Sequence, residues 1–406
     1  MLRPEELYGS PNALAPHYSA FQVSERLLLT GHSHQAWPDQ GFEGQRQAWR
    51  DAADCVDEKW VRAFERAERV REGFARLLGD EPGRIALGAN THELITRFVS
   101  ALPLRERLRL LTTDGEFHTI RRQLDRLAEE GIEVVRVPSR PADAIAERLC
   151  AEVDARTAAV LVSAVLYRNA HIVPGLERVA QACRNAGAEL LVDAYHAVGV
   201  LPVALAEQGL EGAFVVGGGY KYCQLGEGNC FLRLPPDCAM RPVLTGWFAE
   251  FGALEGAAET EGKAGGSAAG RVAYGPGPAR FAGSTYDPTS HYRAAEVFAF
   301  FREHELTPAL LREVSRHQVG RLADRFDALN ADPGVIDRDR SVPLSGIGGF
   351  LALDSPHAEW LYRRLRERGV HSDYRGETLR LGPAPYLADA QLDAAIDALE
   401  ESLRTL

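Results

Sequence analysis

The feature that most constrains the fold of this chain is an alternation of short apolar runs with helical stretches, which begins near Arg84. Several of the runs are almost wholly apolar, which is typical of strands buried on both faces of a parallel sheet. The alternation therefore predicts an α/β fold with a mostly parallel sheet that helices cover on both faces. The expected strands are 84–87, 107–112, 133–137, 158–162, 189–193 and 212–216. The expected helices between them are 91–101, 119–130, 142–152 and 176–186.

The regions on either side of this alternation have other patterns. Residues 41–78 carry apolar side chains at helical spacing among charges, which predicts one or two amphipathic helices. Residues 253–278 are rich in Gly, Ala and Glu without a periodic apolar face, so a long loop is expected there. The remainder predicts helices at 293–304, 311–329, 358–368 and 389–406 and strands at 348–353 and 379–381. We expect three parts, which are an N-terminal segment at 1–50, a large ligand-binding domain at 51–290 and a small α+β domain at 291–406.

Charge and composition restrict the classes of function. A net charge of −11 over 406 residues argues against binding to a nucleic-acid backbone, which needs a basic face. No run of about 18 apolar residues is present, so the sequence predicts no membrane contact and a cytoplasmic protein. The cysteines lack CxxC spacing and are expected to be reduced thiols rather than a disulfide framework or a zinc site. They are Cys55, Cys150, Cys183, Cys223, Cys230 and Cys238.

An acid and a lysine stand at the ends of two successive predicted strands. Asp193 ends the run at 189–193, where open α/β sheets bind ligands, although a helix cap is an alternative role for it. Lys221 follows the next apolar run among glycines and tyrosines, whereas most lysines have polar neighbours. A partly desolvated lysine has a lowered pKa, which a Schiff-base nucleophile needs. Together they form the pair that pyridoxal 5'-phosphate (PLP) requires, a carboxylate for the pyridine nitrogen and an amine for the aldehyde.

The phosphate and the ring of such a cofactor place further demands on the sequence. A phosphate favours a helix N-terminus with free N–H groups, and Gly88-Ala89-Asn90-Thr91 lies between a predicted strand and its helix. Asn90 can also be a simple helix cap, and the two roles are compatible. Phe117 opens the next helix and is the candidate to stack on the ring, although a single Phe is more often part of the core.

These motifs resemble the kynureninase branch of the class V, fold-type I PLP-dependent enzymes, and the resemblance spans nearly the whole chain. Its most specific part is the segment from Asp193 through His196 to Gly199, followed by Gly219-Tyr220-Lys221-Tyr222. Weaker matches are Leu29-Thr30-Gly31-His32-Ser33 where the substrate enters, Glu116-Phe117, Ser163 with Tyr167-Arg168, Gly246-Trp247-Phe248, Gly283-Ser284-Thr285, and the stretch from Tyr374-Arg375 to Tyr386. The resemblance implies a large PLP-binding domain with a mostly parallel seven-stranded sheet and a smaller C-terminal α+β domain.

The resemblance also implies roles for the residues of the PLP pair. Lys221 would form the Schiff base with PLP and later move the Cα proton of an amino acid. Asp193 would keep the ring nitrogen protonated, His196 would lie near the ring, and Tyr220 would donate its phenol to the phosphate. Arg380 would hold the α-carboxylate of the substrate through two hydrogen bonds, for which a guanidinium is suited.

Other positions follow from the weaker matches. By resemblance, the further cofactor-binding residues are Asn90, Thr91, Phe117, Ser284 and Thr285. The further substrate-binding residues are Ser33, His34 and Trp247. Because the segment with Ser284 and Thr285 reaches the partner subunit's site in the family, a homodimer with its site at the subunit interface is implied.

The sequence departs from the family on the substrate side. In kynureninases a histidine in the helical segment near the N-terminus helps to hold the aromatic end of the substrate, but residues 53–60 contain none. Phe117 is followed by His118-Thr119 rather than Pro-Ser. The leading hypothesis is a kynureninase-like hydrolase or lyase that cleaves a side-chain bond of an L-amino acid. Alternatives on the same site are a class V aminotransferase and a β-eliminating C–S lyase.

Other classes of protein fit the sequence less well. His32, His34 and His196 could suggest a metal site, but no nearby acidic set completes a known motif, so no metal is expected. Cysteine desulfurases share the fold and use a thiol on a late loop, whereas no cysteine follows Cys238 here. A hypothesis of a different class is a non-catalytic α/β protein that binds a phosphate ligand or a partner protein.

Overall fold

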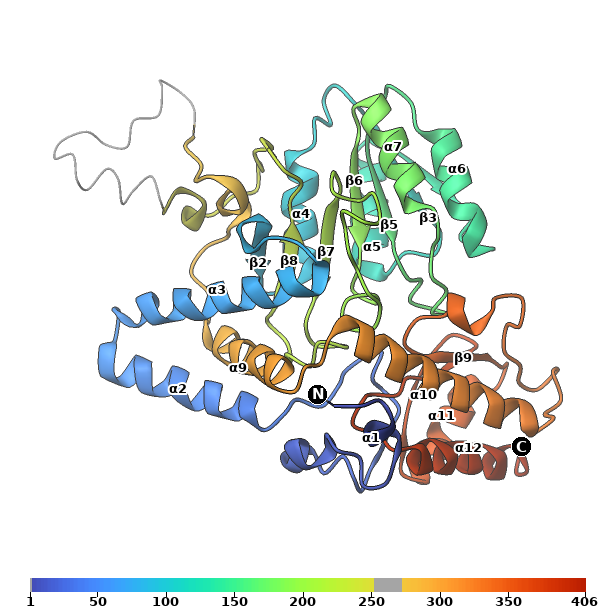
Figure 1. The fold of residues 1–406 in the computed structure, drawn as a ribbon. Coiled ribbons are helices and arrows are strands. Elements are labelled where there is room, and N and C mark those ends of the chain that lie inside the picture. Colours follow the sequence, from blue (N-terminus) through green and yellow to red (C-terminus); the bar gives the residue numbers. More distant parts are fainter. Residues whose placement is uncertain (1, 252–271) are drawn as a thin grey trace.

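A computed structural model of the chain describes residues 2–251 and 272–406. Its centre is a seven-stranded sheet with the strand order β2-β8-β7-β6-β5-β3-β4 (Figure 1). The strands β3 to β7 run parallel, and β8 is antiparallel to both of its neighbours. The strands are β2 (Ile85–Gly88), β3 (Arg109–Thr113), β4 (Glu133–Val137), β5 (Thr157–Ser163), β6 (Glu189–Asp193), β7 (Phe214–Gly218) and β8 (Cys230–Arg233). The predicted α/β fold with a mostly parallel seven-stranded sheet is therefore confirmed.

Helices cover both faces of this sheet, which explains why its strands are apolar on both sides. The helices α4 (Thr91–Ala101) and α5 (His118–Glu129) pack together, and α6 (Ile145–Glu152) packs against α7 (Leu176–Ala186) (Figure 1). Successive residues of a strand face opposite sides. In β6, Leu190 and Val192 join the apolar cluster of α6 and α7, whereas Leu191 joins that of α4 and α5.

The remaining elements surround one end of the sheet. Two helices near the N-terminus, α2 (Gln40–Cys55) and α3 (Lys59–Leu78), both pack against α9 (Thr289–Glu303). The C-terminal part holds a three-stranded antiparallel sheet of order β11-β12-β9 with the helices α10 (Pro308–Ala328), α11 (Ala358–Glu367) and α12 (Asp389–Leu403). Its strands are β9 (Leu351–Asp354), β11 (Asp373–Arg375) and β12 (Thr378–Leu381).

The N-terminal segment is joined to this C-terminal part by backbone pairing. The strand β1 (Leu27–Leu28) pairs in parallel with β10 (Val370–His371). Beyond it, the Gly31 amide donates to the Gly382 carbonyl at 2.7 Å, and the Gly382 amide donates to the Leu29 carbonyl at 2.8 Å. A Cβ on Gly31 would lie 2.3 Å from the Pro383 carbonyl oxygen, so the two segments can approach this closely only because this residue lacks a side chain.

Several elements differ from the sequence expectations. β7 begins and ends two residues later than the expected strand at 212–216, which brings Gly217 and Gly218 into the sheet. β8 was not expected, because its apolar run is short and its antiparallel direction breaks the alternation of strands with helices. Most of the expected loop at 253–278 falls outside the described residues. The division of the chain at residues 50 and 290 stays a prediction.

The close contact between α2 and α9 gives a test of the packing. Gly44 lies in α2, where a Cβ would come within 2.4 Å of the Tyr292 carbonyl oxygen, so Gly44→Ala should destabilise the protein although Ala favours helices. At Gly320 in α10 a Cβ would lie 3.9 Å from Leu344 Cδ1, which is an ordinary contact distance. Gly320→Ala should therefore stabilise the protein by up to about 1 kcal/mol. Urea midpoints of the two variants should move in opposite directions, and a shared direction would contradict this packing.

Candidate active site

The predicted pair of Asp193 and Lys221 lies at the carboxyl ends of two adjacent central strands. Asp193 is the last residue of β6, and Lys221 follows the end of β7 at Gly218. Because β6 and β7 pair in parallel, with Asp193 opposite Val216, the two side chains leave the sheet at the same edge. This is the edge at which open α/β sheets bind ligands.

The Lys221 amine is enclosed by an imidazole and three aromatic rings, which we call the Lys221 cluster. Its Nζ lies 2.5 Å from His196 Nε2. The ring centroids of Tyr195, Phe117 and Tyr220 lie 4.7, 5.5 and 5.8 Å from the same nitrogen. Lys221 is only 7% exposed, so the amine is nearly removed from water.

Burial determines the protonation of this cluster. It lowers the pKa of Lys221 to about 7, with the charge of Arg380 adding to the effect and that of Asp193 opposing it. Burial and the neighbouring Lys221 hold the pKa of His196 well below its ordinary value. The imidazole is therefore neutral, and its Nε2 can accept a hydrogen bond from the lysine amine. A neutral buried amine is the form that attacks an aldehyde.

The buried carboxyl groups of Asp193 and Glu116 lie near each other. Burial raises the pKa of Asp193, while the Tyr195 amide donates to its Oδ1 at 2.9 Å and opposes this rise. Glu116 is 2% exposed, and burial raises its pKa to about 7, with Asp193 adding to the shift. Ser163 donates its hydroxyl to Glu116 Oε2 at 2.5 Å, and the Thr113 hydroxyl donates to Oε1 at 2.7 Å. Glu116 is thus a hydrogen-bonded acid held close to the strand end that carries Asp193.

The predicted phosphate site lies at the N-terminus of α4. Asn90 caps the helix, because its side chain accepts a hydrogen bond from the Glu93 amide at 2.9 Å. The Thr91 amide interacts with the buried thiol of Cys230, which also lies 3.7 Å from the Tyr195 hydroxyl. The helix end therefore approaches the aromatic side of the Lys221 cluster, as a phosphate attached to a bound ring would require.

The arrangement of residues fits PLP. The neutral amine of Lys221 suits the aldehyde, and the buried carboxyl of Asp193 on the adjacent strand suits the pyridine nitrogen. His196 Nδ1 is buried and has no hydrogen-bond partner among the described residues, which is uncommon for a polar atom in a protein core. A ligand beside His196 would account for that unpaired atom.

On the substrate side, Arg380 is buried next to the Lys221 cluster but already has partners. Its Nε and Nη2 donate to the two carboxylate oxygens of Asp373 at 2.8 and 2.5 Å. Its Nη1 donates to the Tyr167 carbonyl at 2.6 Å. His34 stacks on Tyr220, with ring centroids 4.8 Å apart. Its side chain is 60% exposed, and the neighbouring Ser33 hydroxyl lies 3.1 Å from its Nδ1.

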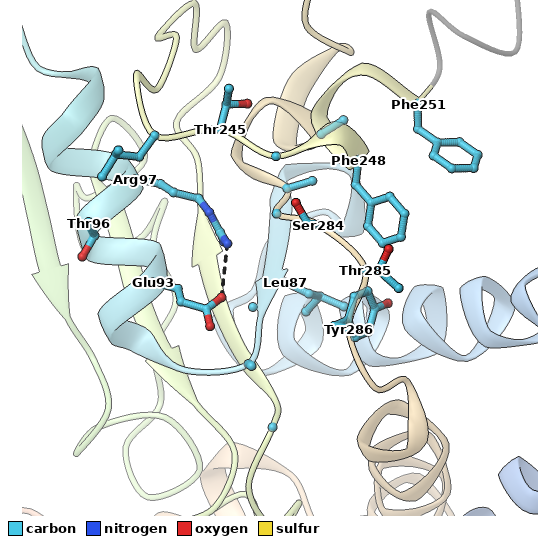
Figure 2. Close-up of a pocket in the computed structure, with 18 of the residues that line it drawn as sticks. Leu87, Glu93, Thr96, Arg97, Thr245, Phe248, Phe251, Ser284, Thr285 and Tyr286 are labelled. Atoms are coloured by element: carbon cyan, nitrogen blue, oxygen red, sulfur yellow. Dashed lines mark hydrogen bonds and ion pairs between the residues drawn. The ribbon is translucent and has the colours of Figure 1, made fainter.

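Three further predicted residues lie in a different place. Ser284 and Thr285 line a cavity of about 880 Å³ between α4, β2 and the segment at 243–251, where Phe248 and Tyr286 also point inward (Figure 2). Trp247 donates its indole N–H to Thr285 Oγ1 at 3.2 Å and is 48% exposed. Lys221 and Asp193 do not line this cavity. Ser284 and Thr285, and Trp247 through its bond to Thr285, therefore lie apart from the Lys221 cluster.

The sequence reasoning assigned no role to three residues that the structure brings to the site. Tyr195 and Glu116 lie within the motifs of the resemblance. Only the fold shows that Tyr195 contacts Lys221 and that Glu116 lies near Asp193. Asp373 could have been found from the tight turn at Gly376, which pairs Asp373 with Arg380 across β11 and β12. No group of three or more potential metal ligands occurs among the described residues, and none of their helices is long and apolar enough to cross a membrane.

In sequence, this chain is similar to curated class V PLP-dependent enzymes. It is 28% identical to the isopenicillin N epimerase of Streptomyces clavuligerus over 352 residues, which cover 82% of this chain and 83% of that protein. It is 22% identical to an uncharacterized aminotransferase of Bacillus subtilis over 347 residues, covering 84% and 85%. A kynureninase of Xanthomonas campestris is 29% identical over 197 residues, covering 44% and 45%. No protein-family profile matches the sequence.

Solved structures share the fold over nearly the whole chain. A cystine C–S lyase in complex with its product cysteine persulfide superposes with a TM-score of 0.80 at 16% identity, covering 95% of this chain and 99% of that one. A cysteine desulfurase from Escherichia coli gives a TM-score of 0.78 at 18% identity and covers all of both chains. The predicted resemblance to class V, fold-type I enzymes and the predicted cofactor PLP are thereby confirmed, whereas the roles of the individual site residues stay predictions.

The lowered pKa of Lys221 predicts how the cofactor-free protein captures PLP. The amine is neutral above its pKa of about 7, so the rate of covalent capture should rise with pH through about 7 and level off about one pH unit higher. Capture at each pH is trapped with borohydride and mapped by peptide mass. The chain has only three lysines, Lys59, Lys221 and Lys263, so Lys59→Arg is the matched control and Lys221→Arg should abolish the product. A rate that still climbs well above pH 8 would show that the amine is not desolvated.

The raised pKa of Glu116 predicts a pH-dependent penalty on folding. Between its ordinary value of 4.5 and about 7, the unfolded chain ionises this group while the folded protein keeps it protonated. The free energy of unfolding should therefore fall with rising pH across that window. Glu116→Gln removes this titration and should become more stable relative to the unmodified protein as pH rises. Urea denaturation of the cofactor-free proteins at several pH values measures the difference, and a constant difference would show that Glu116 is ionised throughout.

Proposed function

We propose that this PLP-dependent enzyme acts on an L-amino acid and cleaves a side-chain bond in the manner of a kynureninase-like hydrolase or lyase. The observation that carries the proposal is the buried amine of Lys221 at the same sheet edge as the buried carboxyl of Asp193. A structural lysine gains nothing from such a place, because burial disfavours its charged form.

The roles of the residues follow from their positions. Bound PLP supplies an electron sink that makes a proton at the substrate Cα acidic. Lys221 would take and return that proton, since its amine is neutral near pH 7. Asp193 would hold a proton at the ring nitrogen, and Phe117 and Tyr195 would exclude water from the lysine. Arg380 would bind the α-carboxylate, and Tyr220 and the N-terminus of α4 with Asn90 and Thr91 would hold the phosphate.

The proposed reaction rests on the kynureninase-like motifs, and the substrate side limits it. The stretch 53–60 has no histidine for an aromatic substrate, so kynurenine itself is not the substrate we propose. A class V aminotransferase and a β-eliminating C–S lyase are alternatives on the same site. Epimerisation is a further candidate, because the epimerase relative covers 82% of this chain and the kynureninase relative only 44%.

We further propose a cytoplasmic homodimer in which each subunit completes the site of the other. Ser284 and Thr285 line a cavity that Lys221 does not line, and Trp247 donates a hydrogen bond to Thr285, which suits residues that serve a partner. The same surface exposes Val243 at 78% and Leu244 at 53%, and large apolar side chains exposed together favour an interface.

A deuterium experiment separates these reactions. The PLP-loaded protein is incubated in D2O with a panel of L-amino acids, and the products are followed by NMR and mass spectrometry. Side-chain cleavage with deuterium at Cα would support the proposal. Deuterium exchange with inversion of configuration at Cα and no cleavage would indicate an epimerase. A keto acid together with an aminated cofactor would indicate transamination. Lys221→Ala should lose exchange in every case. Protein that stays colourless with PLP would instead favour a non-catalytic binding protein.

A further inference from the structure

The hydrogen bonds of Arg380 leave one edge of its guanidinium available. A guanidinium has five N–H groups. In Arg380 the Nε and one Nη2 hydrogen are donated to Asp373, and one Nη1 hydrogen is donated to the Tyr167 carbonyl. One hydrogen remains on each terminal nitrogen. A carboxylate that binds Arg380 can therefore reach it only from the terminal edge while Asp373 keeps the side edge.

The Asp373 carboxylate is itself fixed from two directions. It is the cross-strand partner of Arg380 in the β11–β12 pair. His32 Nε2 lies 2.8 Å from Asp373 Oδ1, and His32 is 1% exposed. Burial lowers the pKa of His32 to about 4, so the ring is neutral and its Nε2–H donates to the carboxylate. Although burial opposes ionisation, the hydrogen bond from His32 and the Arg380 guanidinium hold the pKa of Asp373 well below its ordinary value.

The backbone holds these groups together. The pairing of Gly31 with Gly382 places His32 against the β11–β12 hairpin. Phe350 packs against both His32 and Arg380. Its ring centroid lies 4.6 Å from the His32 ring centroid and 5.5 Å from Arg380 Cζ. The Phe350 ring centroid also lies 6.0 Å from that of His196, so one phenyl ring contacts both the guanidinium and the Lys221 cluster. Three distant parts of the chain thus determine the orientation of one guanidinium.

We propose that Asp373 is a positioning residue for Arg380 and that His32 supports it. Asp373 binds the Nε and Nη2 side of the guanidinium, so the side between the two terminal nitrogens is left for the α-carboxylate of the substrate. The inference rests on the proposed function, because it assumes that Arg380 binds that carboxylate. Asp373 neutralises the guanidinium beforehand, so selection of a carboxylate depends on two aligned N–H groups rather than on an excess of positive charge. The proposed substrate class is therefore amino acids with a free α-carboxylate, and amines without one are rejected.

The test compares amino acids with the matching amines. Two pairs, L-alanine with ethylamine and L-phenylalanine with phenethylamine, are titrated into the PLP-loaded protein, and binding is followed by the cofactor absorbance. Asp373→Asn places an amide N–H against the guanidinium, so the preference for the amino acid should fall at least tenfold while binding of the amine and of PLP stays unchanged. Glu377→Gln removes an exposed carboxylate from the same hairpin and is the matched control. It should leave the preference as it is.

Each outcome separates the inference from the proposed function. An unchanged preference in an Asp373→Asn protein that binds PLP overturns the inference and leaves the function standing. An unmodified protein that prefers neither member of a pair, or responds to none, counts against the proposed function itself. If Asp373→Asn fails to bind PLP, His32→Gln decides, because it keeps the ion pair and changes only the group that supports Asp373. A lowered preference in that variant supports the inference, and an unchanged preference overturns it.

Discussion

The site depends on the removal of one primary amine from water. The Lys221 amine is held among an imidazole and three aromatic rings, and this enclosure lowers its pKa. Withdrawal of an ammonium ion from water costs several kcal/mol unless the proton leaves. The rigid central strands make this possible, since β6 and β7 fix the acid and the lysine at one edge. The same burial keeps His196 neutral and raises the pKa of Glu116 to about 7.

Much of the fold could be predicted from the sequence, because its signals are local. Strands that are apolar throughout alternate with amphipathic helices, and the bounds expected for 133–137, 189–193 and the helix at 91–101 agree with β4, β6 and α4. Asp193 and Lys221 could be paired for the same reason, since Asp193 ends one strand and Lys221 follows the next. β8 could not be predicted in this way, because an antiparallel strand of four residues leaves no distinct pattern.

The contacts that complete the site depend on tertiary structure. Burial raises the pKa of Glu116, and Ser163 at the end of β5 opposes that rise by donating its hydroxyl and amide to the carboxyl, so both effects depend on the folded chain. Arg380 was identified by its motif, but its partner Asp373 depends on the register of a hairpin and on a histidine hundreds of residues away. Ser284 and Thr285 matched a family pattern, yet they line a cavity that Lys221 and Asp193 do not line (Figure 2). Spacing along a sequence does not show which distant residues the fold brings together.

The backbone hydrogen bond between Gly31 and Gly382 has a consequence for the order in which the parts of the molecule can fold. Residues that enclose the substrate side come from two segments about 350 residues apart in the sequence, so both segments must be synthesised before that half can close. The central sheet, whose strands lie between residues 85 and 233, can assemble earlier from contacts closer in sequence. During synthesis the edge with Lys221 would therefore be able to form while the substrate side is still open, and the pairing of Gly31 with Gly382 would follow.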